Sequence, residues 1–397
     1  MSRLARRVSA LTPSLTLAIA ARTKALKAEG INIHGLSAGE PDFDTPAVIT
    51  AAAHAALARG ETKYGPVSGQ PLLRRLIADK LAKENGLPFT PEQILVTNGG
   101  KQSLYNAIMA LIEPGDEVLI PAPYWLSYPE MVALAGGTSV FLPTDEASDF
   151  KISAAQLEAA ITPRTRLLIL NSPSNPTGMI YNRSELQALA EVVVRRDLLV
   201  ISDEIYEKLV YDRAEHVSIG SFGPEIFQRT IISGGFSKAY AMTGWRLGYL
   251  AGPSDIVEAA SNIQGHSTSN VAVFAQAGAI AALQEPSIPE TVEAMVRVFA
   301  ERRLRMFSAL SAIDGIQCCC SQGAFYLFPN ISASGLDSTT FCEQLLDQFH
   351  VAAVAGVAFG SDSHIRLSYA TDNETIDQGI AGIKRFMATR LTYASLR

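Results

Sequence analysis

The central part of the chain alternates short apolar runs with amphipathic segments, and this alternation limits the folds that the chain can adopt. Apolar runs predict strands at 94–97, 117–120, 167–170, 198–202, 230–233 and 247–251. Helical periodicity is expected at about 101–112 and at 184–196, with Ser184 as the N-cap of the second helix. Strands that alternate with helices favour an α/β fold with a largely parallel sheet and helices on both faces. Ligands then bind at the carboxyl ends of the strands.

The C-terminal part has a different pattern, typical of a smaller α+β unit. A long helix is expected at about 290–310, followed by short strands and by a closing helix at 374–388. The predicted strands lie near 316, 325–328, 351–354 and 365–369. We expect three parts: an N-terminal arm that joins the small domain (1–45), a large ligand-binding domain (46–285) and a small C-terminal domain (286–397).

The composition is that of a well-packed enzyme. Of 397 residues, 48% are hydrophobic and 18% are charged, which argues against a disordered chain. The formal net charge is −6 and no basic run alternates with aromatic residues, so nucleic acid is not an expected partner. No apolar run reaches the roughly 18 residues that a membrane span requires. We therefore expect a protein that binds neither nucleic acid nor a membrane.

Cysteine and histidine usage indicates a cytoplasmic protein without a metal site. Three cysteines are adjacent and cannot form a disulfide framework, so reduced thiols are expected. The cysteines are Cys318, Cys319, Cys320 and Cys342. The six histidines are scattered without metal-ligand spacing, so no metal is predicted. Arg3, Arg6 and Arg7 precede the short apolar stretch 15–21, which we interpret as an ordered arm and helix rather than an export signal.

Polar residues suited to ligand binding follow several of the predicted strands. Gly99, Gly100 and Lys101 stand at a helix start, where free backbone N–H groups favour a phosphate. Later loops contribute Asn175, Asp203, Tyr206, Lys238 and Arg246. Taken singly, each residue has an ordinary structural explanation: a glycine turn, a loop, a helix cap, a salt-bridge partner or a surface lysine. Together they place a phosphate cradle, an amide, an acid with a phenol, and a lysine at one rim of the sheet.

This set of groups matches pyridoxal 5′-phosphate (PLP). Asp203 would keep the pyridine nitrogen protonated, which makes the ring an electron sink. Asn175 and Tyr206 would form hydrogen bonds with the phenolate oxygen. Lys238, as a desolvated amine on a glycine-rich turn, would form the Schiff base. Arg246 would pair with the phosphate as a planar donor fork.

Six motifs, in order, resemble the class I aminotransferases of PLP fold type I. They are G-E-P-D-F-D-T-P (39–46), K-Y-G-P (63–66), N-S-P-S-N-P-T-G (171–178), S-D-E-I-Y (202–206), S-K-A-Y-A-M-T-G-W-R (237–246) and R-L-S-Y-A (366–370). The similarity runs from about 11 to 386, and G-G-K-Q-S-L and P-Y-W-L-S-Y-P-E-M bring the chain nearest to the bacterial-type aspartate aminotransferases. The resemblance implies a large domain with a mostly parallel seven-stranded sheet between helices, and a small α+β domain.

The resemblance also implies roles for further residues. Arg366 would clamp the substrate α-carboxylate, and Gly39 would contact the substrate through its backbone. Tyr64 would reach the phosphate of the neighbouring subunit, so the active enzyme would be a homodimer with shared active sites. Lys101 would bind the distal carboxylate of a dicarboxylic substrate. Auxiliary candidates are Trp125, which would stack on the cofactor ring or pack in the core, Ser14 and Thr16 beside the substrate, and Ser237 beside the phosphate.

Three positions depart from the pattern of the family. Relatives that also act on prephenate carry a basic residue where Thr12 stands, which argues against prephenate. Ala355 replaces a proline, so its loop is expected to be less rigid. Gly235 stands where some relatives have a hydroxyl, so Ser237 or another group would complete the phosphate site.

The resemblance implies transamination of small amino acids and 2-oxo acids. The expected reaction moves the amino group of L-aspartate to 2-oxoglutarate by a ping-pong mechanism and gives oxaloacetate and L-glutamate. Prephenate/glutamate or aromatic transamination, and a PLP-dependent lyase, are the alternatives on the same fold. A nucleotide-binding enzyme is disfavoured because the chain lacks both G-x-x-x-x-G-K-[ST] and G-x-G-x-x-G.

Overall fold

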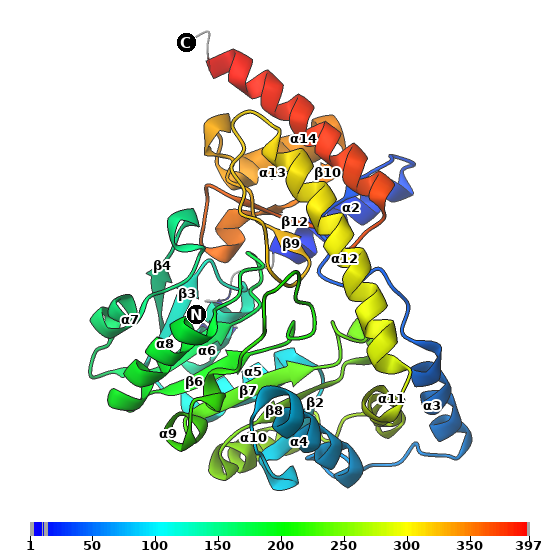
Figure 1. The fold of residues 1–397 in the computed structure, drawn as a ribbon, viewed down its shortest axis with the longest axis vertical. Helices are drawn as coiled ribbons and strands as arrows, with labels where there is room; N and C mark the ends of the chain where they lie inside the picture. Colours follow the sequence, from blue (N-terminus) through cyan, green and yellow to red (C-terminus); the bar gives the residue numbers. More distant parts are fainter. Residues whose placement is uncertain (1–3, 10, 12–14, 395–397) are drawn as a thin grey trace.

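A computed structural model describes residues 4–9, 11 and 15–394 of the chain, and its main feature is a seven-stranded sheet (Figure 1). The strands are β2 (Ile94–Thr97), β3 (Glu117–Ala122), β4 (Thr138–Pro143), β5 (Thr165–Asn171), β6 (Leu199–Asp203), β7 (Thr230–Gly235) and β8 (Gly248–Ala251). The strand order is β2-β8-β7-β6-β5-β3-β4. Strand β8 runs antiparallel to both neighbours, and the other pairs are parallel. The predicted mostly parallel sheet is confirmed.

Helices cover both faces of this sheet because its strands are apolar on both sides. In β5, Leu167 and Ile169 join one buried cluster, whereas Leu168 and Leu170 join another. The first cluster includes side chains of α5 (Gly100–Leu111), α6 (Ser127–Ala135) and α10 (Ser254–Ser267). The second includes side chains of α7 (Ala154–Ala160), α8 (Arg183–Arg195) and α9 (Pro224–Phe227). A third cluster packs α3 (Ala47–Ala58), α4 (Pro71–Asn85) and α11 (Val273–Gln284) near β2 and β8.

The N-cap of α8 differs from the prediction. Asn182, not Ser184, caps the helix: its Oδ1 accepts a hydrogen bond from the Glu185 backbone N–H at 2.9 Å. The Glu185 carboxylate accepts one from the Asn182 N–H at 2.7 Å. Glu185 stands three residues after Asn182, which is the spacing that this reciprocal capping box requires.

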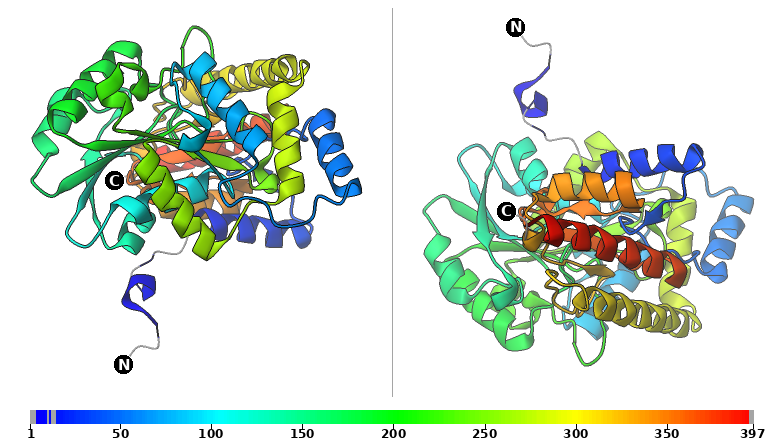
Figure 2. Two further views of the ribbon diagram at one scale, coloured as in Figure 1. Left: turned by 90° about the horizontal axis from the view of Figure 1, so that it is seen from below. Right: turned by 90° about the horizontal axis from the view of Figure 1, so that it is seen from above.

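The C-terminal elements form a smaller α+β unit beside the large sheet. Strands β11 (Val354–Ala355), β12 (Ile365–Ser368) and β9 (Tyr326–Leu327) form an antiparallel sheet in that order. The helices of this unit are α12 (Ile288–Ser311), α13 (Ser338–Phe349) and α14 (Asn373–Ala394). Helix α12, yellow in Figure 1, runs from the vicinity of α11 to the C-terminal elements. Seen from above, α13 and α14 lie side by side (Figure 2).

The N-terminal segment packs with the C-terminal unit. Its helices are α1 (Arg6–Ser9) and α2 (Leu15–Ala28). Strand β1 (His34–Gly35) pairs in parallel with β10 (Val351–Ala352). Leu36 lies in the same buried cluster as Phe341 and Phe386. This pairing is in line with the expected grouping of the arm with the small domain, whose boundaries at 45 and 285 stay a prediction.

Short 3₁₀ helices occupy several loops. They are η1 (Pro91–Gln93), η2 (Glu146–Ser148), η3 (Ile219–Ser221), η4 (Thr243–Trp245), η5 (Ser332–Ser334) and η6 (Gly356–Phe359). Within the part of the chain that the structure describes, no helix combines the length and the apolar character needed to cross a membrane.

Candidate active site

A cavity of about 870 Å³ lies between the large sheet and the C-terminal unit. Most of the predicted site residues line it: Gly39, Gly100, Lys101, Trp125, Asn175, Asp203, Tyr206, Ser237, Lys238, Arg246 and Arg366. Those of the large unit come from segments far apart in the sequence that meet at one rim of the large sheet, whereas Gly39 belongs to the N-terminal segment and Arg366 to β12 of the C-terminal unit.

The remaining predicted residues have other positions. Gly99 is not a lining residue but lies directly beside Arg246. Tyr64 is 92% exposed and does not line the cavity of its own chain. Ser14 lies outside the described residues; the backbone of Thr16 belongs to α2, but its side chain is outside the described part.

Lys238 stands on the turn after β7 and its amine enters the cavity. Its Nζ donates a hydrogen bond to the Gly39 carbonyl oxygen. The same nitrogen lies 5.8 Å from the ring centroid of Tyr206 and 5.7 Å from that of Phe325. Burial lowers the Lys238 pKa to about 8, with Glu40 opposing this shift and Arg366 and Arg246 adding to it. The neutral, nucleophilic form of the amine is therefore far more populated near neutral pH than in an ordinary lysine, although it is still the minor form.

Asp203 ends strand β6 and its carboxylate is almost fully buried. Its Oδ2 accepts a hydrogen bond from the Tyr128 hydroxyl at 2.7 Å, and its Oδ1 accepts one from the Ile205 N–H at 3.2 Å. Burial raises the Asp203 pKa to about 6, and these two hydrogen bonds oppose that rise. A buried carboxylate in this position can hold a cationic N–H group of a ligand.

Arg366, on β12, brings a buried guanidinium to the cavity from the C-terminal unit. Its Nη1 donates to Asn175 Oδ1 at 2.9 Å and its Nη2 to the Ser37 carbonyl at 3.2 Å. Its buried Nε has no hydrogen-bond partner among the described residues. The guanidinium lies 4.4 Å from the ring centroid of Tyr326, whose hydroxyl contacts that of Tyr206 at 2.9 Å. A buried guanidinium that lines a cavity and has no carboxylate partner within the described part of the chain suits a carboxylate ligand.

A second group of donors surrounds the start of α5. Gly99 has a φ of +82°, and a Cβ there would lie 2.7 Å from Arg246 Nη2, so a side chain would push the arginine away. Arg246 donates to the Thr243 carbonyl at 2.9 Å and to the Asn98 carbonyl at 3.4 Å, and the residue is exposed. The free N–H groups at the helix start and the guanidinium together form an anion-binding site.

Lys101, in the first turn of α5, lines the cavity beside Trp125. Its Nζ stands 4.9 Å from the centroid of the Trp125 ring. Burial and the nearby Arg246 charge lower the Lys101 pKa. A cation that is desolvated and repelled by a neighbour gains from an anionic partner. This geometry is suited to a carboxylate at the side-chain end of a ligand.

Two contact residues were not among the predictions. Tyr128, in the first turn of α6, contacts Asp203, and its place in the motif P-Y-W-L-S-Y-P-E-M was the available signal. Tyr326 contacts Tyr206 from β9, 120 positions later in the chain. No local pattern indicates such a long-range pair.

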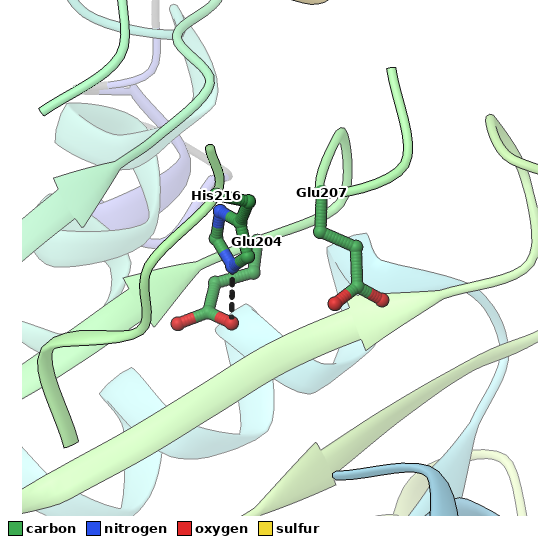
Figure 3. Close-up of side chains that lie close together, drawn as sticks. All are labelled: Glu204, Glu207 and His216. Atoms are coloured by element: carbon green, nitrogen blue, oxygen red, sulfur yellow. Dashed lines mark hydrogen bonds and ion pairs between the residues drawn. The ribbon is translucent and has the colours of Figure 1, made fainter. Parts of the chain in front are cut away.

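A buried polar cluster lies behind Asp203 and includes Glu204, Glu207 and His216 (Figure 3). Glu204 accepts a hydrogen bond from His216 Nε2 at 2.9 Å. It also accepts hydrogen bonds from the hydroxyls of Ser202 at 2.8 Å and Ser218 at 2.6 Å. These side chains offer the ligand types of a cation site. The neighbouring donors already saturate the carboxylates, however, so we interpret the cluster as a structural network.

Glu207 is the second carboxylate of this network. It pairs with the ammonium of Lys80 and accepts a hydrogen bond from Asn85 Nδ2 at 2.8 Å. Burial opposes its charge, but Lys80 and His216 lower its pKa to about 2. Burial likewise opposes the positive form of His216, yet Glu204 raises its pKa overall. The charges therefore compensate one another inside the fold.

Glu207→Gln is expected to lower the free energy of unfolding at neutral pH by about 2 kcal/mol, because the buried Lys80 would keep only the longer contact with Glu84 at 3.6 Å as an ion pair. The Glu207 pKa is lowered on folding, so its stabilisation is full above 4.5 and is lost as the pH falls towards about 2. The difference between variant and parent should shrink over that interval. Urea denaturation at several pH values measures it.

Glu293→Gln serves as the control, because Glu293 forms an exposed pair with Arg297 on α12 at 3.3 Å. This variant should change stability little at any pH. A Glu207→Gln protein as stable as the parent at neutral pH would show that the buried network does not stabilise the fold.

The chain was compared with known proteins. The family model described as aminotransferase class I and II matches residues 31–383. The aspartate aminotransferase of Geobacillus stearothermophilus is 47% identical over 393 residues, which cover 98% of this chain and 100% of that protein. The aspartate/prephenate aminotransferase of Cereibacter sphaeroides is 45% identical over 399 residues, which cover 98% of this chain and 99% of that protein. The structure of the Thermus thermophilus aspartate aminotransferase with maleate superposes with a TM-score of 0.94 at 41% identity. The superposition covers 97% of this chain and 100% of that one.

Proposed function

The chain belongs to the class I and II aminotransferase family, and we propose that it transfers the amino group of L-aspartate to 2-oxoglutarate with PLP as its cofactor. The observation that carries this proposal is the meeting of Lys238, Asp203 and Arg366 in one cavity. An amine of lowered pKa, a buried carboxylate and a buried guanidinium are the groups that transamination of an amino acid needs.

The residues present fit the cofactor. Asp203 would hold its pyridine N–H, and Asn175 and Tyr206 would contact its phenolate oxygen. Its phosphate would lie at the start of α5, where Gly99 leaves room beside Arg246. Trp125 and Ser237 line the same cavity and complete the proposed set, Trp125 beside the ring and Ser237 beside the phosphate. When bound, PLP supplies an electron sink for the bonds at the substrate Cα.

The side chains of the cavity have separate tasks in the proposed reaction. Lys238 would hold the cofactor through its aldehyde in the resting enzyme. When free, its amine would carry the proton from the substrate Cα to the former aldehyde carbon of the cofactor, and in the opposite direction in the second half-reaction. Its pKa of about 8 suits both directions of that transfer. Arg366 binds the α-carboxylate and Gly39 contacts the substrate through its backbone. The position of Arg366 on the C-terminal unit would let closure of that unit exclude water.

Preference for a dicarboxylic substrate is proposed from Lys101. Arg366 and Lys101 line one cavity from different units, so a substrate with a carboxylate at each end can pair with both. Ser14 and Thr16 remain proposed auxiliary contacts from the N-terminal arm. The Thermus relative is named together with maleate, itself a dicarboxylate. Relatives named for aspartate and for aspartate/prephenate are similarly close, so prephenate is the second acceptor to test.

Lys101→Ala is expected to lower kcat/KM for aspartate by about 100-fold, through loss of one charge-assisted contact. The value for phenylalanine should change about threefold or less, since that donor has no distal carboxylate. An assay of aspartate, glutamate and phenylalanine as donors, with 2-oxoglutarate and prephenate as acceptors, measures the effect.

Lys208→Ala is the matched control for this assay, because Lys208 pairs with Glu84 at 2.6 Å and does not line the cavity. Equal loss for aspartate and phenylalanine would contradict the dicarboxylate assignment. A parent enzyme that prefers prephenate to 2-oxoglutarate would favour the second candidate function.

We also propose that the active form is a homodimer. Tyr64 is 92% exposed, and Arg246 is exposed at the edge of the cavity. A second copy of the chain that placed its Tyr64 beside Arg246 would cover the proposed phosphate site.

The proposed small domain combines residues 1–45 with residues 286–397, and the proposed large domain is 46–285. The four cysteines are free, which supports a cytoplasmic location.

A further inference from the structure

Tyr128 lines the candidate cavity and also belongs to a buried core cluster. It lies in the first turn of α6 and is 2% exposed. Its ring packs edge-to-face on Trp125, with centroids 5.3 Å apart. Its hydroxyl donates to Asp203 Oδ2 at 2.7 Å. A carboxylate only accepts hydrogen bonds, so the phenol must donate here while Asp203 is ionised.

Asp203 lies in surroundings that disfavour its charge. Burial is the largest cause of its raised pKa, and the neighbouring Glu204 adds to the rise. The phenol of Tyr206, on the same segment, also faces it. The groups that oppose the rise are Tyr128 from α6, the Ile205 N–H and the Lys238 amine. Of these, Tyr128 is the neutral side-chain donor, and its ring packs in a core cluster.

The two hydrogen bonds also orient the carboxylate. Tyr128 holds Oδ2 and the Ile205 N–H holds Oδ1, so the carboxylate plane is set from both sides. The ring of Tyr128 is fixed in turn by the core cluster that packs α6 on the sheet. A charged group held in its working orientation before the ligand arrives loses little free energy to reorganisation on binding.

We propose that Tyr128 is a positioning residue for transamination, whose hydroxyl keeps Asp203 ionised and aimed at the pyridine nitrogen of the cofactor. The inference rests on the proposed function, because the partner of Asp203 is taken from it. Tyr128 acts through Asp203, to which its hydroxyl donates.

The test uses Tyr128→Phe in the full-length protein. Affinity for PLP is measured by titrating cofactor-free protein, and the pH dependence of kcat/KM is measured on the reconstituted enzyme. PLP affinity is expected to fall about 10-fold or more, the typical effect of losing a hydrogen bond to a charged group. The acidic limb of the kcat/KM profile should move up by about one pH unit, because Asp203 would gain its proton more readily.

Tyr181→Phe is the matched control. Tyr181 is another buried tyrosine of the large unit, whose hydroxyl accepts a hydrogen bond from the Ile152 N–H at 3.0 Å, away from Asp203. This variant should lose stability without a shift of the pH profile. An equal shift of the profile in both variants would assign the effect to general loosening of the fold and overturn the inference.

A double-mutant cycle gives a second measurement. In an Asp203→Asn background, Tyr128→Phe should weaken PLP affinity by little more than Asp203→Asn alone, since the two residues act together. Full additivity would overturn the inference. If the parent binds and transaminates but Tyr128→Phe equals it in both readouts, the inference alone is wrong. If the parent shows no PLP binding and no borohydride labelling at Lys238, the proposed function fails and the inference fails with it.

Discussion

Lys238→Ala is expected to lower turnover by about 10⁴-fold or more, the largest effect of any substitution in the cavity. The proposed role gives this amine two tasks, covalent attachment of the cofactor and proton transfer at Cα. No other described residue of the cavity offers an amine of comparable pKa next to Gly39 and Tyr206. Loss of the side chain removes both tasks together.

The measurement is a single-turnover assay with aspartate, together with the absorbance of bound PLP. Lys208→Ala, which removes a lysine outside the cavity, should retain parental turnover. Thermal unfolding should show that Lys238→Ala is folded, since the side chain makes one hydrogen bond, to a backbone carbonyl. Turnover near the parental value in a folded Lys238→Ala protein would refute the assigned role.

Arg366→Ala is expected to lower kcat/KM by about 10³-fold for every amino donor, whatever its side chain. Arg366 is 3% exposed, and its guanidinium lines the cavity and holds two hydrogen bonds. Truncation removes the α-carboxylate partner and also leaves Asn175 without its donor. Arg366→Lys should recover a part of the loss, because an ammonium keeps the charge but not the planar fork.

Steady-state kinetics with aspartate and phenylalanine separate this role from that of Lys101. Arg366→Ala should lower kcat/KM for both donors to the same extent, whereas Lys101→Ala should lower kcat/KM for aspartate selectively. Arg305→Ala is the control, because Arg305 lies on the surface of α12 and pairs with Asp377 at 2.7 Å. A strong preference between donors in Arg366→Ala would contradict its assignment to the α-carboxylate.

Much of the large unit was predictable because its signals are local. The predicted strand 94–97 matches β2, and the predicted helix 101–112 matches α5 to within one residue at each end. The prediction of Ser184 as the N-cap of α8 was wrong. Asn182 and Glu185 form a capping box, so the N-cap lies two residues earlier than predicted. The antiparallel direction of β8 had no signal, because an apolar run carries no information about strand direction.

The order of the apolar strands and of the polar loops that follow them can be predicted from the sequence alone. Both are recognised from residues that are neighbours in the chain. The sequence therefore determined the α/β architecture and predicted that Lys238, Asp203 and Asn175 lie together. Contacts between distant segments were decided by tertiary packing alone. Examples are Arg366 on Asn175, 191 positions apart, and Tyr128 on Asp203, 75 apart. The lowered Lys238 pKa and the raised Asp203 pKa belong to the same class, because desolvation exists only after the chain has folded around them.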